Sequence, residues 1–340
     1  MKRTLALVVV GALAVGSTLA GQTTQITGAG ATFPDPIYEK WFSEYNKLHP
    51  DVQINYQPIG SGGGVTQVSK QVVFFGASDF PMTDQQLTDA PSKLFHFPTV
   101  LGGVVPIYNV PGLTADLKFT GPVLADVFLG KITKWNDAKI AALNPGVKLP
   151  ASDITVVHRS EGSGTTFIWC DYLSKVSPEY KTKVGAAGSV NWPVGLGAKG
   201  SDGVTGLVKQ TPGALGYVEL IYALQNHISF GEVQNAAGKW VKPGLASVTA
   251  AAAAAAANMP ADFRVSITNA SGDAAYPISS FTWLLLYETP KDKPMAKRMN
   301  DFVKWALTDG QKLCADLGYA PLPANVVKLE LAQLEKIKVQ

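Results

Sequence analysis

The sequence predicts an α/β protein of two lobes, and three observations support this. Short β-branched runs lead into a glycine-containing turn and then into apolar residues at helical spacing at three places. About 320 residues would remain after an export signal, more than one hydrophobic core commonly serves. Two long apolar segments, residues 97–110 and 276–286, are strand-like and long enough to pass between lobes.

Residues 1–20 are typical of a secretory signal peptide. Lys2 and Arg3 precede an apolar run, and small residues lead to Ala20, where we expect cleavage. No cysteine directly follows that point, so a lipid-anchored lipoprotein is not expected, and apart from the alanine tract at 250–257 no later apolar run is long enough to span a bilayer. We therefore expect a periplasmic protein, exported by a cleaved signal peptide, with no direct membrane insertion.

The charge of the mature chain is nearly balanced. The sequence holds 29 Lys and Arg against 26 Asp and Glu, so losing Lys2 and Arg3 leaves 27 against 26 and a formal net charge of +1. Nucleic acid and anionic membranes favour a basic face, so neither is an expected partner. Cys170 and Cys314 lie within apolar helical patterns and are expected to be buried thiols.

The first unit is a strand that ends near Gly30 and a helix whose first turn contains two prolines. This places Thr32 and Phe33 at a helix N-terminus. The glycines resemble part of a dinucleotide-binding loop. However, the third glycine of that motif is missing and no acid ends the next strand, residues 52–56, so this alternative is disfavoured.

The second unit follows the strand at 52–56. A glycine-rich loop, residues 60–64, contains Ser61 and lets backbone approach a ligand closely, and a helix is expected from about residue 65 to 72. A buried strand then ends at Asp79. In isolation, such an acid more often caps the following helix than contacts a ligand.

The third unit gathers the most groups able to hold an oxyanion. A buried strand at 153–157 leads into a turn and a helix, and Ser163 or Thr165 can cap that helix so that its first N–H groups point outward. Arg159 adds a planar fork of donors that Glu161 can hold in place. Gly164 permits tight geometry. The alternative is that these residues merely turn and cap the chain.

The remaining elements complete the α/β pattern. A short helix, residues 204–209, follows a glycine-rich loop, and a strand ends at Glu219. Further helices are expected at 124–128, 137–143, 250–257, 296–306, 310–317 and in a last amphipathic segment after residue 323.

The sequence gives little support for an enzyme. His49, His96, His158 and His227 are scattered without metal-ligand spacing, and no base can be assigned to Ser61 or Ser163. His158 and Arg159 are successive strand residues that point to opposite faces, which favours a structural histidine. We expect no catalytic residues and no metal or cofactor.

Four motifs occur in order, at residues 28–34, 59–65, 75–79 and 159–165. With them, the chain strongly resembles the phosphate-binding proteins of bacterial ABC phosphate importers, from about Thr27 to Val327. The resemblance implies a type II periplasmic binding protein fold: two lobes, each a mixed sheet flanked by helices, a ligand cleft between them and two crossover segments. We expect lobe 1 at 24–106 and 280–340 and lobe 2 at 107–279.

The resemblance also implies roles for individual residues and partners. Phosphate oxygens would accept hydrogen bonds from seven positions, while Asp79 would act as an acceptor and Glu161 would support the arginine. The chain departs from the family at two positions. Many relatives have Asp in place of Phe74, and some have Asp in place of Glu161. A monomer that docks on an ABC permease with ATPase subunits is implied. The seven donor positions are Thr32, Phe33, Ser61, Arg159, Ser163, Gly164 and Thr165.

Asp79 distinguishes the candidate ligands. A carboxylate suits an anion that carries a proton, as hydrogen and dihydrogen phosphate do, and opposes sulfate, which at neutral pH does not. The sequence thus predicts phosphate binding. The alternatives are another oxyanion such as sulfate or molybdate, a sugar phosphate, or a secreted phosphatase.

Overall fold

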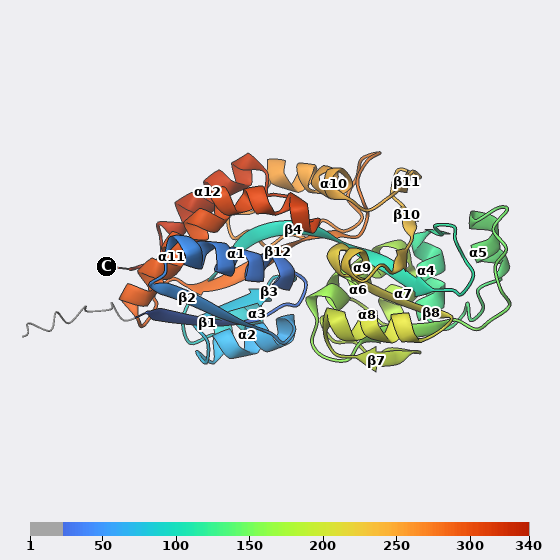
Figure 1. Cartoon of the computed structure of the whole chain (residues 1–340), viewed down its shortest axis with the longest axis horizontal. Coiled ribbons are helices and arrows are strands. Elements are labelled where there is room, and N and C mark those ends of the chain that lie inside the picture. Colours follow the sequence, from blue (N-terminus) through green and yellow to red (C-terminus); the bar gives the residue numbers. More distant parts are fainter. Residues whose placement is uncertain (1–22, 340) are drawn as a thin grey trace, which may run out of the picture.

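Two α/β lobes lie side by side, joined by one long strand, β4 (Leu94–Asn109), that runs through both (Figure 1). The computed structural model describes residues 23–339, so the predicted signal peptide lies outside the described residues. Within that range, no helix combines the length and apolar character that crossing a membrane requires.

The central sheet has the strand order β2-β1-β3-β12-β4-β8-β6-β7, with β9 also paired to β4. Parallel pairing joins β1, β2 and β3 in lobe 1 and joins β6 to its neighbours in lobe 2, while β12 and β8 are antiparallel to β4. Each lobe therefore has a mixed sheet. The bounds are β1 Thr24–Gly30, β2 Val52–Pro58, β3 Phe75–Ser78, β6 Thr155–Arg159, β7 Leu196–Ala198, β8 Ala214–Glu219, β9 Ser229–Phe230 and β12 Ser279–Tyr287.

Strand β4 changes partner where the lobes meet. Its residues up to Gly103 pair with β12, and from Val104 onward it pairs with β8. The predicted crossing at residues 97–110 is confirmed. The second predicted crossing, at residues 276–286, is wrong, because β12 pairs with β3 and with the lobe 1 part of β4. The Val104 N–H also donates to the Ile278 carbonyl at 2.8 Å, so the chain crosses before β12.

Helices flank both lobes (Figure 1). Their apolar faces build an aromatic core: in lobe 1, the rings of Phe42 and Phe302 lie 5.3 Å apart, and in lobe 2 Trp169 stacks on Tyr217 at 5.1 Å. The helices of lobe 1 are α1 Asp35–Leu48, α2 Ser61–Ser69, α3 Asp84–Asp89, α11 Lys293–Leu307 and α12 Ala324–Leu334. Those of lobe 2 are α4 Gly121–Phe128, α5 Ala138–Leu143, α6 Gly164–Val176, α7 Pro178–Lys183, α8 Gly200–Gln210 and α9 Leu220–Gln225.

Three expected elements differ from the structure. Helix α2 begins at Ser61, so the predicted glycine loop is its first turn, and α8 begins at Gly200, inside the second predicted loop. Residues 310–317 form two short 3₁₀ helices, Asp309–Leu313 and Ala315–Leu317. Glycine has low helix propensity, and close tertiary packing overrides it here.

The alanine tract forms α10 (Leu245–Ala257), as expected from helix propensity. This helix lies beside α12 (Figure 1): Asn325 donates to the Ala256 carbonyl, and Ala256 packs with Phe263 and Val326. The expected range 107–279 assigned the segment to lobe 2, yet these contacts join it to lobe 1. A small sheet of β5 (Lys118–Phe119), β10 (Glu232–Gln234) and β11 (Trp240–Val241) precedes it.

Cys170 and Cys314 are both free and buried, as predicted. Burial raises the pKa of each thiol to about 12, so both stay protonated at neutral pH.

Candidate anion-binding site

The residues singled out in three distant stretches of sequence meet where the two lobes face each other. Lobe 1 contributes the turn after β1, the start of α2 and the residue after β3; lobe 2 contributes the end of β6 and the start of α6. All are buried, with none more than 6% exposed: Thr32, Phe33, Ser61, Asp79, Arg159, Ser163 and Thr165. Gly164 is buried as well.

The start of α6 is the helix terminus that lobe 2 brings to the interface. Ser163 is its N-cap, and the Ser163 hydroxyl accepts a hydrogen bond from the Thr166 N–H at 3.1 Å. The predicted cap is confirmed. The N–H groups of Gly164 and Thr165 belong to the first turn, where helical N–H groups lack intrahelical partners and the positive end of the dipole favours an anion.

Arg159 ends β6 beside that helix start, with its side chain 1% exposed. Its Nε donates to Glu161 Oε1 at 2.8 Å, and its Nη2 contacts the same oxygen. Glu161 Oε1 also accepts from the Gly200 N–H at 3.1 Å, which ties the pair to α8. The expected support of Arg159 by Glu161 is confirmed, and these contacts all lie within lobe 2.

The other edge of the guanidinium points to hydroxyl groups. Arg159 Nη1 lies 3.3 Å from both Thr165 Oγ1 and Ser201 Oγ. These bonds orient Nη1 toward the lobe interface, so one planar cation borders the first turns of α6 and α8 together.

Asp79 is the carboxylate of the lobe 1 half. Its Oδ1 accepts from the Thr282 hydroxyl at 2.8 Å and its Oδ2 from the Ser61 hydroxyl at 3.3 Å. Burial raises the pKa of Asp79 to about 7, against the lowering effects of Thr282, Arg159 and Ser61. The alternative that Asp79 caps a helix is wrong, because Thr83 caps α3.

Glycine allows the two halves to meet. A Cβ added at Gly164 would lie 2.5 Å from both Asp79 Oδ2 and Ser61 Oγ, so any side chain there would push the lobes apart. The backbones also bond across the interface, with the Gly62 N–H donating to the Gly162 carbonyl at 2.9 Å. The structure is therefore a closed arrangement of the lobes.

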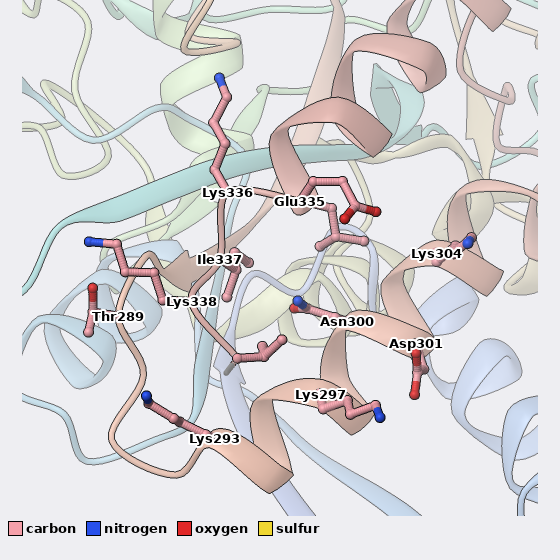
Figure 2. A pocket seen from close by; sticks show the side chains of 12 residues that line it. Thr289, Lys293, Lys297, Asn300, Asp301, Lys304, Glu335, Lys336, Ile337 and Lys338 are labelled. Carbon is pink, nitrogen blue, oxygen red and sulfur yellow. The ribbon is translucent and has the colours of Figure 1, made fainter.

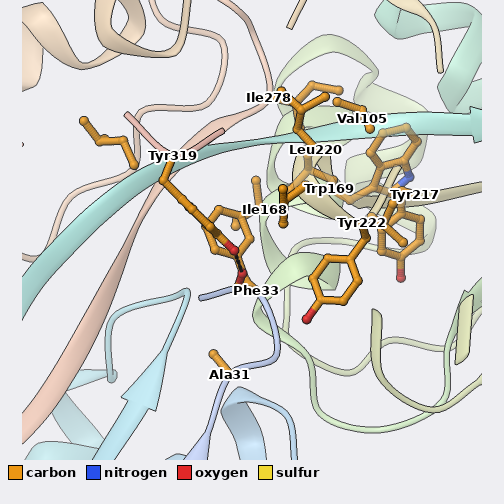
Figure 3. Close-up of a cluster of buried hydrophobic side chains, with 14 of the residues drawn as sticks. Ala31, Phe33, Val105, Ile168, Trp169, Tyr217, Leu220, Tyr222, Ile278 and Tyr319 are labelled. Atoms are coloured by element: carbon orange, nitrogen blue, oxygen red, sulfur yellow. Dashed lines mark hydrogen bonds between the residues drawn. The ribbon is translucent and has the colours of Figure 1, made fainter. Parts of the chain in front are cut away.

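Thr32 and Phe33 complete the lobe 1 half, at the start of α1. The Thr32 hydroxyl lies 2.9 Å from Ser201 Oγ, and the Tyr222 hydroxyl donates to the Thr32 carbonyl at 2.6 Å. Tyr319 donates in the same way to the Phe33 carbonyl at 2.6 Å, and Figure 3 shows its ring extending to Phe33. Two tyrosines thus fix the backbone of this turn.

Sequence reasoning missed Ser201 and Thr282. Ser201 is fully buried and contacts Thr32 across the interface as well as Arg159, while Thr282 lies on β12 and holds Asp79. A signal for Ser201 was present: glycine followed by a hydroxyl residue before an apolar helical pattern, as at the other two helix starts. Thr282 carries no such local signal.

His158, the histidine next to Arg159, packs as a structural residue. The ring of His158 stacks on Trp192 at 4.8 Å, and burial lowers the pKa of this histidine. Among residues 23–339, no group of three or more His, Cys, Asp or Glu side chains could hold a metal ion.

A separate groove lies in lobe 1 between α11 and the residues after α12 (Figure 2). Its lining is rich in lysine and includes none of the predicted site residues. The lysines are Lys293, Lys297, Lys304, Lys336 and Lys338.

The fold and the interlobe cluster of donors define the class. Residues 17–310 match the PBP superfamily domain, and with two mixed-sheet lobes joined by crossing segments the chain is a two-lobed periplasmic binding protein.

Relatives identify the family within that class. The chain is 49% identical over 308 residues to the phosphate-binding protein PstS of Xylella fastidiosa (strain 9a5c), covering 90% of this chain and 84% of that one. It is 46% identical over 316 residues to the same protein of Pasteurella multocida (strain Pm70), covering 93% and 91%. The chain therefore belongs to the PstS family of phosphate-binding proteins.

A solved structure agrees with this fold. A phosphate-binding protein from Stenotrophomonas maltophilia superposes with a TM-score of 0.71 at 20% identity, over 91% of this chain and 94% of that one.

Proposed function

We propose that this protein binds inorganic phosphate between its lobes, as hydrogen or dihydrogen phosphate, and delivers it to the membrane permease of an ABC phosphate importer. Membership of the PstS family supports this. The observation that carries the proposal is the meeting of Arg159 and the first turn of α6 with the buried Asp79 carboxylate. Donors for an anion and an acceptor for its proton thus face one point.

The donors for the phosphate oxygens come from both lobes in this proposal. Those of lobe 2 are Arg159, Ser163, Gly164 and Thr165, and those of lobe 1 are Thr32, Phe33 and Ser61. An anion that leaves water loses a large hydration energy, which charge-assisted hydrogen bonds of about 1.5–3 kcal/mol each restore. Several such bonds give tight binding without a metal or a cofactor.

Asp79 sets the choice of anion. In the closed lobes it accepts the proton of phosphate, whereas a sulfate oxygen at the same point would carry none and would face a carboxylate. The Thr282 and Ser61 bonds hold the Asp79 oxygens in place for that contact. An unpaired buried acceptor costs about 1–3 kcal/mol, or roughly five- to 150-fold in affinity, before repulsion is counted.

The remaining features of the proposal concern the protein's setting. The protein works in the periplasm after cleavage of its signal peptide, as a monomer and not as an enzyme. Closure of lobe 1, which includes α10, on lobe 2 presents the loaded form to the permease, whose ATPase subunits are separate chains. The ligand favours closure because its contacts with both lobes exist only in the closed form.

Calorimetric titration of phosphate-stripped protein with phosphate and with sulfate tests the proposal, repeated on Asp79→Asn. Wild type should bind phosphate tightly and give no sulfate heat. In the variant, the ratio of phosphate affinity to sulfate affinity should fall by roughly tenfold or more, because an amide can donate to an unprotonated sulfate oxygen. Equal binding of sulfate and phosphate by wild type, or binding of neither, would sink the assignment; tight sulfate binding alone would favour the second oxyanion class.

A further inference from the structure

Glu219 lies at the point where the chain passes from lobe to lobe. It is the last residue of β8 and pairs with Val104, the residue at which β4 leaves β12 for β8. Its side chain is fully buried. A carboxyl group with no access to water at the junction of two moving bodies calls for a physical explanation.

Only one oxygen of the Glu219 carboxyl group has a hydrogen-bond partner. Oε2 accepts from the Ile221 N–H at 3.1 Å and caps α9, whereas Oε1 has no hydrogen-bond donor. Among residues 23–339, no cation forms an ion pair with it. A Cβ at Gly102 would lie 3.2 Å from Oε1 and 2.6 Å from the ring of Phe33, so the surroundings are tightly packed.

The titratable groups that face Glu219 are Tyr319, Tyr222 and Asp79. Tyr319 donates its single hydroxyl proton to the Phe33 carbonyl, so toward Glu219 its oxygen can only accept. Figure 3 shows Phe33, Tyr319 and Tyr222 gathered at this junction. A neutral Glu219 can donate to that oxygen, but an ionised one finds no donor there.

The electrostatics agree with this geometry. Burial, first among the causes, holds the pKa of Glu219 well above its usual range, and the Asp79 charge adds to the rise. The α9 backbone N–H groups act in the opposite direction, and the Tyr319 hydroxyl would do so only by donating to Glu219 in place of the Phe33 carbonyl.

We propose that Glu219 is a positioning residue that takes up a proton when the lobes close: neutral, it donates to Tyr319, which holds the Phe33 carbonyl and so the phosphate-facing turn. Phe33 and Tyr319 belong to lobe 1, whereas Glu219 and α9 belong to lobe 2. Opening separates them, returns the carboxyl to water and releases the proton. This inference rests on the proposed phosphate binding.

A linkage follows. Between the pKa of Glu219 in the open protein and its higher value in the closed protein, closure takes up one proton, so phosphate affinity falls by up to about tenfold per pH unit as pH rises. Below that window the carboxyl is neutral in both forms and contributes no pH dependence.

Glu219→Gln is the test, since it keeps the size of the side chain and the cap of α9 but cannot ionise. Phosphate titrations in two buffers of different ionisation enthalpy, at a pH of about 8, count the protons taken up. Wild type should take up about one more proton per phosphate than the variant. At a pH of about 8.5 the variant should bind phosphate about tenfold tighter or more relative to wild type, and at acid pH equally.

Glu330→Gln is the matched control. Glu330 is also fully buried with unpartnered carboxyl oxygens and a pKa well above its usual range, but it lies within α12, away from the lobe junction. Its burial does not change on closure in this proposal, so this variant should keep the proton count and the pH profile of wild type.

Infrared difference spectra before and after phosphate add a second readout. A band of protonated carboxylic acid should grow in wild type and in Glu330→Gln but not in Glu219→Gln. Equal proton counts and parallel pH profiles for wild type and Glu219→Gln, or no such band, would overturn the inference while phosphate binding itself stood. Absence of phosphate binding in wild type would instead refute the proposed function.

Discussion

The two halves of the interlobe site differ in charge. Lobe 2 brings a buried guanidinium, Arg159, and a side-chain-capped helix start, whereas lobe 1 brings the Asp79 carboxylate and a helix, α2, with no side-chain cap. The charge of lobe 2 attracts an anion, whereas Asp79 of lobe 1 repels an anion that carries no proton. In the proposed function, capture and selection of the anion are thus divided between the lobes.

The division has a physical advantage. The charge of Arg159 is already balanced by Glu161, so helix N–H groups and hydroxyls supply the remaining attraction and no net positive charge is buried. Asp79 contacts the anion only when closure brings it close to Gly164. In the proposed function, an anion without a proton can therefore bind lobe 2 and still leave the lobes open.

Removing the Arg159 cation should cause the largest loss of phosphate affinity. We expect Arg159→Ala to weaken phosphate binding by about 3–5 kcal/mol, or roughly a hundred- to several-thousandfold, because Glu161 is then left without its partner. Calorimetry measures the loss. Arg264→Ala is the control, since Arg264 is a partly buried arginine that pairs with Asp84 and Asp262 away from the site. Comparable losses in both variants would mean that Arg159 has no special role.

Blocking closure should have the next largest effect. Gly164→Ala adds a methyl group 2.5 Å from the Asp79 and Ser61 oxygens, so we expect phosphate affinity to fall by about 1–3 kcal/mol, or roughly five- to 150-fold. The helix itself should tolerate alanine. Small-angle scattering with phosphate should report a wider average separation of the lobes than in wild type.

Gly206→Ala in α8 controls for the substitution, because a Cβ there meets nothing within 4 Å. It should leave affinity unchanged. If Gly164→Ala closed normally and bound phosphate as wild type does, the close approach of Asp79 to α6 would not be required for binding.

Ser201→Ala should have the smallest effect and sharpen the comparison. Ser201 joins lobe 2 to Thr32 and supports Arg159, so its loss should cost about 1 kcal/mol, close to fivefold in phosphate affinity. Ser174→Ala, which removes a hydroxyl without a partner in α6, should change nothing. A loss as large as that of Arg159→Ala would place Ser201 in direct contact with phosphate.

Much of this protein follows from its sequence because it depends on neighbours along the chain. Ser163 caps α6 through the residue three positions on, and Glu161 holds Arg159 from two positions away. The long apolar run that becomes β4 is equally local. Such features need only hydroxyl, charge and hydrophobic patterns at short spacing, which a sequence displays directly.

Tertiary packing decided the rest. Ser61 begins a helix despite three following glycines of low helix propensity. Packing requires one of these glycines, because a Cβ at Gly64 would lie 2.5–2.8 Å from Gly30, Ala77 and Ala29. Thr282 reaches Asp79 from 203 positions away. The sequence alone determined which residues could hold an anion; only the fold decided which met, because contacts between distant segments depend on how the lobes pack and leave no local pattern.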